Sequence, residues 1–356
     1  MRIALIGAYG YTGQLICEEL KSSGFKFSVY GRDFHKLIQL KNSNSFITHT
    51  LAIDIRQKED VLQVLNANDI IINCAGPFTE ESAVLLHQIV LLGKTYLDIT
   101  GEVEFVKKSR ELYHSIACTH NALVLHGNAF ESLIADLGIQ LLTKNKSPLR
   151  SIKTFYQFNQ MKCSPGTRMT MKLSKFRDSL KIKNHNWVLD NKTESPQKLN
   201  LPKQDNYSAI AYPLPEIAYS FWNHHVKEAA SYLILPHSEA LFYSKSKKTG
   251  NPLSLLDEIR LRKKEGPRTE ERKHQKSNVF IEVDYYNGKS NTLLLESVDM
   301  YLTTAKAVVL SLKEITNSKN NYSGVISPAE LFKNQELRTL KNLSVTVNET
   351  SKITSL

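Results

Sequence analysis

The sequence predicts an α/β fold, in which a Rossmann-type doubly wound parallel sheet is followed by a second α+β domain built on an antiparallel sheet. Three observations support this prediction. The chain opens with a strand, a glycine turn and a helix in MRIALIGAYGYTGQLICEEL, and strand and helix patterns then alternate as far as residue 148. Beyond residue 148, apolar and polar residues alternate within the predicted strands, which is typical of an antiparallel sheet with one solvated face.

The opening turn has the glycine spacing of a dinucleotide-binding site. The apolar run Arg2–Ile6 predicts a buried strand, and Gly7, Gly10 and Gly13 follow it just before helical spacing begins. The first glycine permits a sharp turn, the second the approach of phosphates, and the third close helix packing. The helix amino terminus attracts the anion, whereas a purely structural tight turn is the alternative. The candidate pyrophosphate-binding residues are Gly7, Tyr9, Gly10, Tyr11, Thr12 and Gly13.

The residues after the second strand favour NADP over NAD. That strand is predicted over Lys26–Tyr30, and an NAD site would place an acid at its end to bind the ribose 2′-hydroxyl. This chain has Gly31 and Arg32 there, with Lys36 one helical turn further on. Arg32 can hold a 2′-phosphate in a bidentate contact, and Lys36 adds a second cation. The alternative is that both are ordinary solvated cations, which at a helix start oppose the helix dipole.

The remaining elements of the first half follow in βα order and bring three segments to one crevice. Strands are predicted over Phe46–Leu51, Asp69–Cys74, Thr95–Asp98 and Ala122–Leu125, and helices over Gln57–Leu65, Glu80–Leu92 and Val103–Cys118. Ligands bind at the carboxyl ends of such strands, where this chain has 75–78, 98–102 and 128–132. The candidate cofactor contacts on these segments are Ala75, Gly76, Pro77, Phe78 and Asp98.

The second half predicts a substrate domain. Strands are predicted over Ser151–Phe158, Ser231–Leu235, Asn278–Tyr286 and Asn291–Ser297, with a turn at Asn287-Gly288, and helices over Thr167–Leu180, Tyr301–Leu312 and Pro328–Phe332. Residues 181–210 are polar with few apolar anchors, which predicts a mobile segment. The predicted domains are a Rossmann domain (1–148), an α+β substrate domain (149–300), helices that return to the Rossmann domain (301–340) and a tail (341–356).

Composition indicates a cytoplasmic protein with two folded domains. The chain has 356 residues, 41% of them hydrophobic, which is enough for two domains with cores and excludes general disorder. Its start has no signal-peptide architecture, it has no apolar stretch that would span a membrane, and its four cysteines lack disulfide or metal spacing. The net charge of +11 has two interpretations. The cations either only keep the surface soluble, or they attract an anionic partner such as NADP, an acidic carrier protein or an anionic membrane surface. The basic run Arg260–Lys276 has no nucleic-acid motif and predicts an exposed loop.

Several motifs together resemble one enzyme family. They are GAYGYTG (7–13), GR (31–32), NCAGPF (73–78), YLDITGE (96–102), AFESLIADLG (129–138), SPGT (164–167), EGP with Arg272, and GVISP (324–328). In this order they resemble the saccharopine dehydrogenase-like oxidoreductases, in particular the branch that includes trans-acting enoyl reductases. The resemblance implies an amino-terminal NADP domain, a substrate domain with an antiparallel sheet, and hydride transfer. One departure concerns Phe130 and Glu131, candidate substrate contacts, because the family has GFDS followed by Pro where this chain has AFES followed by Leu133.

The candidate residues for acid–base chemistry are Asp98, Glu102 and Tyr301. Hydride addition to an enoyl or carbonyl group leaves an oxyanion, which needs a hydrogen-bond or proton donor nearby. Each candidate has an alternative role: Asp98 as a ribose contact, Glu102 as a helix cap, and Tyr301 as a core aromatic. Ser164 and Thr167 flank a glycine and can bind a substrate carbonyl or phosphate, or Thr167 can cap a helix.

The sequence thus leaves two functions open. The first is an NADPH-dependent reductase that acts on an enoyl, keto or imine group of a metabolite or acyl thioester, as a monomer or homodimer. The second is a non-catalytic NADP-binding sensor or scaffold protein, since a fold hosts many chemistries. The altered segment at 129–134 and the absence of an obvious acid–base pair favour the second. No metal site is predicted from the His, Cys and carboxylate spacing.

Overall fold

The computed structural model describes residues 1–79, 82–144, 148–159, 162–174, 179–190, 195–199, 206–249, 265–317, 321–332 and 343–348. The chain forms two compact units. Unit 1 consists of Met1–Leu133 and Tyr301–Gln335, and unit 2 of Ile134–Met300 and Glu336–Leu356. Each unit is therefore built from two separate stretches of the sequence.

Unit 1 contains a seven-stranded sheet in the order β15-β6-β5-β4-β1-β2-β3, and every pair in it is parallel. The central part, with β1 between β4 and β2, is the strand order of a dinucleotide-binding fold. The predicted parallel sheet is thus confirmed, and the predicted six strands gain a seventh from the carboxyl-terminal part of the chain. The strands are β1 (Ile3–Ile6), β2 (Phe27–Gly31), β3 (Ile47–Ala52), β4 (Ile70–Asn73), β5 (Thr95–Asp98), β6 (Leu123–Leu125) and β15 (Gly324–Ile326).

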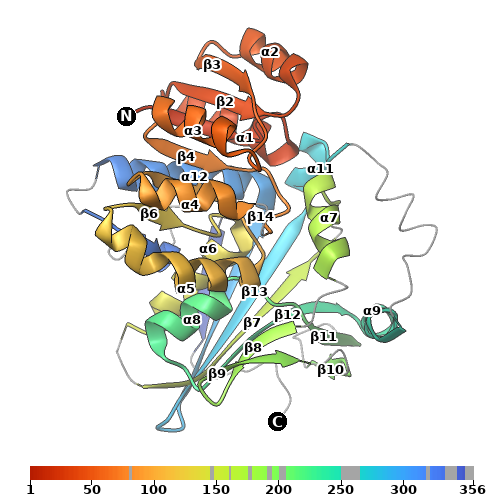
Figure 1. Ribbon diagram of the computed structural model, residues 1–356. Coiled ribbons are helices and arrows are strands. Elements are labelled where there is room, and N and C mark those ends of the chain that lie inside the picture. The colour runs from red at the N-terminus through yellow and green to blue at the C-terminus, as the bar shows by residue number, and fades with distance from the viewer. Residues whose placement is uncertain are drawn as a thin grey trace. The chain divides into compact units, whose positions relative to one another are not determined.

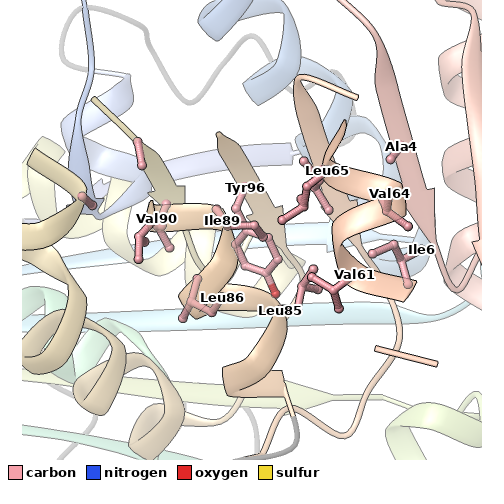
Figure 2. Packing of buried hydrophobic residues seen from close by; sticks show 14 of the residues in the cluster. Ala4, Ile6, Val61, Val64, Leu65, Leu85, Leu86, Ile89, Val90 and Tyr96 are labelled. Atoms are coloured by element: carbon pink, nitrogen blue, oxygen red, sulfur yellow. The ribbon is translucent and has the colours of Figure 1, made fainter. Parts of the chain in front are cut away.

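Helices cover both faces of this sheet, with α3, α4 and α5 along one face and α12 along the other (Figure 1). Ala4 and Ile6 of β1 and Tyr96 of β5 pack against α3 and α4 in one buried cluster, which Figure 2 shows from close by. The strands of this sheet are buried on both faces, and such strands are mostly apolar. This is why β1 and β4 have the continuous sequences IALI and IIIN and not an alternation of apolar and polar residues. The helices are α1 (Tyr11–Ser22), α2 (Phe34–Ser43), α3 (Lys58–Ala67), α4 (Ala83–Leu91), α5 (Val103–Thr119), α12 (Met300–Asn317) and α13 (Pro328–Leu331). A further helix, α6 (Phe130–Leu142), begins in unit 1 and continues in unit 2.

Unit 2 contains a nine-stranded mixed sheet. Seven strands follow the order β10-β11-β12-β7-β13-β14-β16, and β8 pairs with β12 and β9. The strands are β7 (Leu149–Phe158), β8 (Ser179–Lys183), β9 (Asn186–Asp190), β10 (Gln197–Lys198), β11 (Tyr207–Ala211), β12 (Glu228–Pro236), β13 (Lys276–Tyr285), β14 (Ser290–Val298) and β16 (Leu343–Asn348). The helices of this unit are α7 (Pro165–Ser174), α8 (Glu216–His224), α9 (His237–Thr249) and α11 (Thr269–Lys273).

The prediction of a half-buried antiparallel strand over Ser151–Phe158 is wrong in one respect. This strand, β7, pairs antiparallel with β13 but parallel with β12, so the sheet is mixed. It is also largely buried, because it lies between two neighbours in the middle of the sheet. The predicted hairpin turn is confirmed, since Gly288 adopts φ +82° and its N–H donates to the Tyr285 carbonyl.

Other differences lie where strands replace predicted helix, mobile segment or tail. The helix predicted over Thr167–Leu180 is α7, which ends at Ser174, and Leu180 lies in β8. Within the predicted mobile segment, β8 and β9 form an antiparallel pair, with Ile182 buried. Where a tail is predicted, β16 pairs with β14 from Ser297↔Leu343 to Thr292↔Asn348.

Two sequence predictions reach beyond the described residues. Glu80 and Glu81, at the start of the helix predicted over Glu80–Leu92, lie outside them, and α4 begins at Ala83. In the basic run, residues 260–264 also lie outside, whereas α11 and the start of β13 occupy the part after Arg268. Of the helices in the described ranges, none combines the length and apolar character needed to cross a membrane.

Candidate cofactor-binding site

The first glycine of the opening turn has a backbone that only glycine fits. Gly7 adopts φ +78°, and its N–H donates to the Tyr30 carbonyl over 2.8 Å. A Cβ atom at this position would lie 2.9 Å from the Ala75 backbone nitrogen. Gly7 therefore lets the chain leave β1 between the ends of β2 and β4, as the sequence predicts.

The other two glycines shape the turn at the start of α1. The Gly10 N–H donates to the Gly7 carbonyl over 2.9 Å, and a Cβ at Gly13 would lie only 2.4 Å from that same Gly7 oxygen. Gly10 is the N-cap and offers no side chain to the first-turn N–H groups, which include that of Thr12. The first turn of α1 also carries no acidic residue. The helix amino terminus is thus suited to a phosphate, as the glycine spacing indicates.

Tyr9 links the glycine turn to the end of β2. Its hydroxyl oxygen accepts hydrogen bonds from the Arg32 N–H at 3.2 Å and from the Asp33 N–H at 3.3 Å. Its ring packs so closely on Gly31 that a Cβ there would lie 2.6 Å from Tyr9 Cε1. The Lys36 ammonium lies 5.4 Å from the centre of the ring. The structure therefore brings Tyr9, Arg32 and Lys36 together, as expected of residues of one site.

Asp33 is an acid at this turn that the sequence reasoning did not use. Its carboxylate caps α2 by accepting from the Lys36 N–H over 3.1 Å, and it pairs with the Lys36 ammonium at 3.4 Å. The backbone hydrogen bond from Lys36 is the main reason that the pKa of Asp33 is lowered. The signal in the sequence was an Asp directly before a helical run, which is typical of an N-cap. The carboxylate is thus committed to the helix.

The segment after β4 is held by a buried amide. Asn73 Oδ1 accepts from the Ala75 N–H at 2.9 Å, and its Nδ2 donates to the Tyr96 hydroxyl at 3.1 Å. Gly76 and Pro77 are exposed and joined by a cis peptide bond. Phe78 instead is buried and lies 6.1 Å from Phe105 between ring centres. The exposed backbone of this segment is available to a cofactor, whereas the Phe78 side chain belongs to the core.

Asp98 is fully buried, and both of its carboxylate oxygens are occupied. Oδ2 lies 2.7 Å from His126 Nδ1, and Oδ1 accepts from the Gly127 N–H at 3.0 Å and the Thr100 N–H at 3.2 Å. These contacts tie the end of β5 to the loop after β6. The geometry thus gives Asp98 a positioning role at the carboxyl edge of the sheet, and its direct contact with ribose or substrate stays a prediction.

His126 completes this network and was not singled out from the sequence. Its Nε2 lies 2.7 Å from Ser109 Oγ of α5, so the ring joins β6, β5 and a helix. Ser109, His126 and Asp98 resemble a nucleophilic triad in order, but Ser109 is only 2% exposed and His126 is fully buried. Burial, and second the charge of Asp98, raise the pKa of the neighbouring Tyr96 well above its usual value. The only sequence signal was a polar residue directly after an apolar strand.

Glu102 lies at the N-cap position of α5, and its side chain turns back onto the preceding loop. Oε2 accepts from Thr100 Oγ1 at 2.8 Å and from the Gly101 N–H at 3.1 Å. The Glu102 N–H in turn donates to Thr100 Oγ1 at 3.1 Å. Glu102 is 8% exposed, so it stabilises the loop and still reaches the surface at this edge of the sheet.

Tyr301 lies beside the glycine turn. Its ring meets that of Tyr11 edge-on, with 5.0 Å between the centres, so the start of α12 packs on the start of α1. Phe130 is fully buried, and its N–H donates to Thr304 Oγ1 of α12 at 3.0 Å. Glu131 is half-buried, and burial raises the pKa of its carboxyl. Of these predicted residues, Tyr301 thus lies next to the predicted phosphate site, and Phe130 anchors α12.

The two remaining candidates lie in unit 2. Ser164 precedes Pro165 and caps α7, because its Oγ accepts from the Thr167 N–H at 3.1 Å and lies 3.0 Å from Thr167 Oγ1. The cap is therefore Ser164 rather than Thr167. Arg168 on the same helix donates to the Cys163 and Glu265 carbonyls. The SPGT and EGP motifs are thus joined in this unit.

Arg272 of the same motif set is also buried in unit 2. It is 6% exposed, and its Nε lies 3.6 Å from Asp299 Oδ2, just before α12. Asp299 adopts φ +56°, and its N–H donates to the Gln275 carbonyl. This ion pair fixes the chain where it leaves β14. Among the described residues, no group of three or more His, Cys, Asp or Glu side chains could hold a metal ion.

Comparisons with known proteins agree with this geometry. Residues 3–129 match the family model of the saccharopine dehydrogenase NADP-binding domain. A saccharopine dehydrogenase-like oxidoreductase of Mus musculus is 26% identical over 176 residues, which cover 44% of this chain and 41% of that protein. A protein of Mycobacterium tuberculosis described as a trans-acting enoyl reductase is 28% identical over 145 residues, which cover 39% of this chain and 35% of that protein. The chain thus matches less than half the length of these relatives.

The fold has a counterpart among solved structures. Apo saccharopine dehydrogenase (L-Glu forming) of Saccharomyces cerevisiae superposes with a TM-score of 0.63 over 98% of this chain and 99% of that one, at 9% identity. The predicted NADP-binding domain, the resemblance stated from the motifs and the two-part fold are therefore confirmed. Residues 3–129 match a saccharopine dehydrogenase NADP-binding domain, and the chain is similar to saccharopine dehydrogenase-like oxidoreductases over less than half its length.

Proposed function

We propose that the protein is an NADPH-dependent oxidoreductase that transfers hydride to an enoyl, keto or imine group. The observation that carries this proposal is the glycine turn of β1 and α1, which approaches the end of β2 where Arg32 is exposed. A turn of this kind is built for a pyrophosphate, and a cation at the second strand suits a 2′-phosphate. The relatives named oxidoreductases and enoyl reductases support the reaction class.

The residues present fit NADP. The Gly10–Gly13 backbone would hold the pyrophosphate, Arg32 and Lys36 would hold the 2′-phosphate, and the exposed Gly76-Pro77 segment after β4 would offer a further contact. When bound, the reduced nicotinamide supplies the hydride. The Asp98–His126 contact would keep the loops after β5 and β6 in fixed positions, and Glu102 and Tyr301 are the groups we propose for hydrogen bonding or proton transfer.

For the substrate we propose an acyl thioester or a related carbonyl metabolite. The relative described as a trans-acting enoyl reductase supports an acyl group held on a carrier. A net charge of +11 favours an acidic carrier protein or an anionic membrane surface as the partner, because opposite charge accelerates encounter. Cysteines without disulfide spacing are in keeping with a cytoplasmic location, which we propose. The proposed oligomeric state is a monomer or a homodimer.

The test is a fluorescence titration with NADPH and NADH in parallel on wild type and Arg32→Asp. We expect tighter NADPH binding in wild type and a loss of tenfold or more in Arg32→Asp, about 1.4 kcal/mol, because the charge-assisted contact becomes a repulsion. Arg150→Asp, which changes an exposed arginine of unit 2, is the control for net charge. Equal NADPH affinity in Arg32→Asp would remove Arg32 from the site, and absence of binding of either nucleotide to wild type would contradict the proposed function.

A non-catalytic NADP-binding sensor or scaffold is the second candidate. One observation favours it: the Asp98 carboxylate, an obvious acid at the edge of the sheet, is fully buried with both oxygens hydrogen-bonded. The two functions differ in turnover. Oxidation of NADPH by enoyl and keto thioesters, followed at 340 nm as the usual nicotinamide absorbance, supports the enzyme, whereas tight NADPH binding without turnover on any carbonyl class supports the sensor.

A further inference from the structure

The Tyr9 hydroxyl lies where the adenosine end of the cofactor would reach the protein. Its oxygen accepts from two successive backbone N–H groups, those of Arg32 and Asp33, at 3.2 and 3.3 Å. These two N–H groups lie at the end of β2, where dinucleotide-binding domains contact the ribose or its 2′-phosphate. Backbone amides that would otherwise bind an anion are thus already occupied by a side chain of the glycine turn.

The Tyr9 hydroxyl can still donate one hydrogen bond. A phenol has one O–H donor and accepts at its lone pairs, and both acceptor positions are used here. Within the part of the chain that the structure describes, no acceptor takes the Tyr9 hydrogen, and Arg32 makes no side-chain hydrogen bond or ion pair. The contact with Gly31 fixes the ring, so the direction of the hydroxyl is set before a ligand arrives.

The charges around this hydroxyl favour an anion. The Arg32 guanidinium is exposed, and the Lys36 ammonium lies over the Tyr9 ring at 5.4 Å. Two nearby acids could repel an anion, but both carboxylates have partners. Asp33 caps α2 and pairs with Lys36, and Asp54 accepts a hydrogen bond from Arg56, with Nε–Oδ1 at 2.9 Å. Arg56 is also the main reason that the pKa of Asp54 is lowered to about 2, and Arg32 contributes to this as well.

We infer that Tyr9 is a specificity-determining residue, whose hydroxyl, oriented by the Arg32 and Asp33 amides, donates a hydrogen bond to the 2′-phosphate of NADPH. This inference rests on the proposed function. A phosphate oxygen accepts from Tyr9 while Arg32 and Lys36 neutralise its charge, whereas the 2′-hydroxyl of NADH gains no charge-assisted bond. The tyrosine therefore discriminates between the two cofactors and does not simply add affinity for both.

The test is the Tyr9→Phe variant, which keeps the ring against Gly31 and removes only the hydroxyl. We expect its dissociation constant for NADPH to rise about tenfold, as for loss of a hydrogen bond to a charged group, and that for NADH to change less than about twofold. Competition with adenosine 2′,5′-bisphosphate and with ADP isolates the 2′-phosphate from the nicotinamide. Tyr286→Phe, at an exposed tyrosine of unit 2, is the matched control, and a melting curve checks that each variant folds.

Three other outcomes would overturn the inference. If NADPH binds more tightly to Tyr9→Phe, the freed amides take the phosphate directly and the hydroxyl is a competitor. If both cofactors weaken equally, Tyr9 only shapes the turn. If the affinities stay as in wild type, Tyr9 is not a contact. In each case wild type still binds NADPH, so the proposed function stands, whereas a wild type that binds neither nucleotide removes the proposed function itself.

Discussion

At the scale of single residues, the sequence identifies a residue type and the structure supplies its environment. Asp98 illustrates this, because an acid at the end of a strand reads as a ligand contact until His126 and two N–H groups are found on its carboxylate. His126 lies 28 residues further along the chain, so no local pattern connects the pair. The sequence predicted that Arg32 and Lys36 follow β2 one helical turn apart, and the structure brings both next to Tyr9.

Glu216 in unit 2 is a second residue whose environment only the structure shows. It is the first residue of α8 and only 1% exposed, and its Oε1 accepts from Thr154 Oγ1 at 2.8 Å and from the Tyr156 hydroxyl at 2.7 Å. Burial is the main cause that raises its pKa from 4.5 to about 7. The folded state therefore holds this proton more tightly than the unfolded state does.

We predict that Glu216→Gln raises stability at pH 8 relative to wild type. Because the folded pKa lies above the unfolded one, the contribution of this group is fully present below pH 4.5 and is lost as the pH rises to about 7. A shift of this size corresponds to about 3 kcal/mol. Glutamine keeps an acceptor for Thr154 and Tyr156 and does not ionise, so the variant escapes this loss.

The measurement is the melting temperature of both proteins between pH 5 and pH 8. The difference between Glu216→Gln and wild type should grow across this interval. Glu239→Gln, at an exposed carboxyl on α9, is the control and should follow wild type at every pH. Parallel curves for Glu216→Gln and wild type would mean that Glu216 is hydrated or already ionised in the folded protein.

At the scale of elements, prediction succeeded where the period of the pattern was unambiguous. The apolar strands and amphipathic helices of the first half lie as predicted, because βα units repeat with short connections. The misplaced elements are short strands. In β16 the sequence LSVTVN alternates between apolar and polar residues, which indicates a strand. Its partner β14 is far away in the sequence, so the sequence alone does not distinguish this edge strand from a tail. The end of α7 was misplaced because Leu180 and Ile182 serve equally well on a helix or a strand.

The glycine turn makes a prediction at this scale. A Cβ at Gly13 would lie 2.4 Å from the Gly7 oxygen and 2.9 Å from the Ala8 oxygen, both of them backbone atoms that cannot move freely. At Gly10 the nearest such contact is 3.1 Å. We expect Gly13→Ala to cost about 2 kcal/mol or more in the free energy of unfolding and to weaken NADPH binding, since the turn must open.

Gly10→Ala is the matched comparison. It adds the same methyl group in the same turn and should lower stability less, with a measurable effect confined to cofactor affinity. Thermal unfolding with and without NADPH, together with a titration, separates the two effects. If Gly13→Ala melts with wild type and binds NADPH equally well, then Gly13 does not lie as close to the Gly7 and Ala8 backbone as described.

At the scale of the whole molecule, both units are discontinuous in sequence. Unit 1 takes Tyr301–Gln335 in addition to its first 133 residues, and these supply α12, β15 and α13. β15 extends the sheet beyond β6, and Val325 belongs to the same buried cluster as Ala4, Ile6 and Tyr96. Arg110 of α5 also donates to the Val325 carbonyl. The amino-terminal unit is therefore completed by Tyr301–Gln335.

We predict that residues 1–300 alone do not form a functional NADPH-binding domain. This truncation removes α12 and β15, so the residues that pack against them, such as Leu123 in β6 and Phe130, would be exposed to water. Residues 1–335 retain these elements and lose only the stretch that contains β16, so they should still bind NADPH with a reduced melting temperature. The measurement is NADPH titration and thermal unfolding of both truncations beside the full chain. Binding by residues 1–300 with wild-type affinity would show that unit 1 is complete without its second stretch.

The sequence by itself determined the parallel sheet, the NADP-binding turn and the cations after β2, because these depend on neighbours a few residues apart and on hydrophobic period. Only the tertiary structure decided that Asp98 is held by His126, that Tyr9 occupies the Arg32 and Asp33 amides, and that β7 runs parallel to β12. The physical reason is the same in each case. Hydrogen bonds and strand pairings between distant residues are chosen by the packing of the whole unit, and no local pattern encodes which partners will meet.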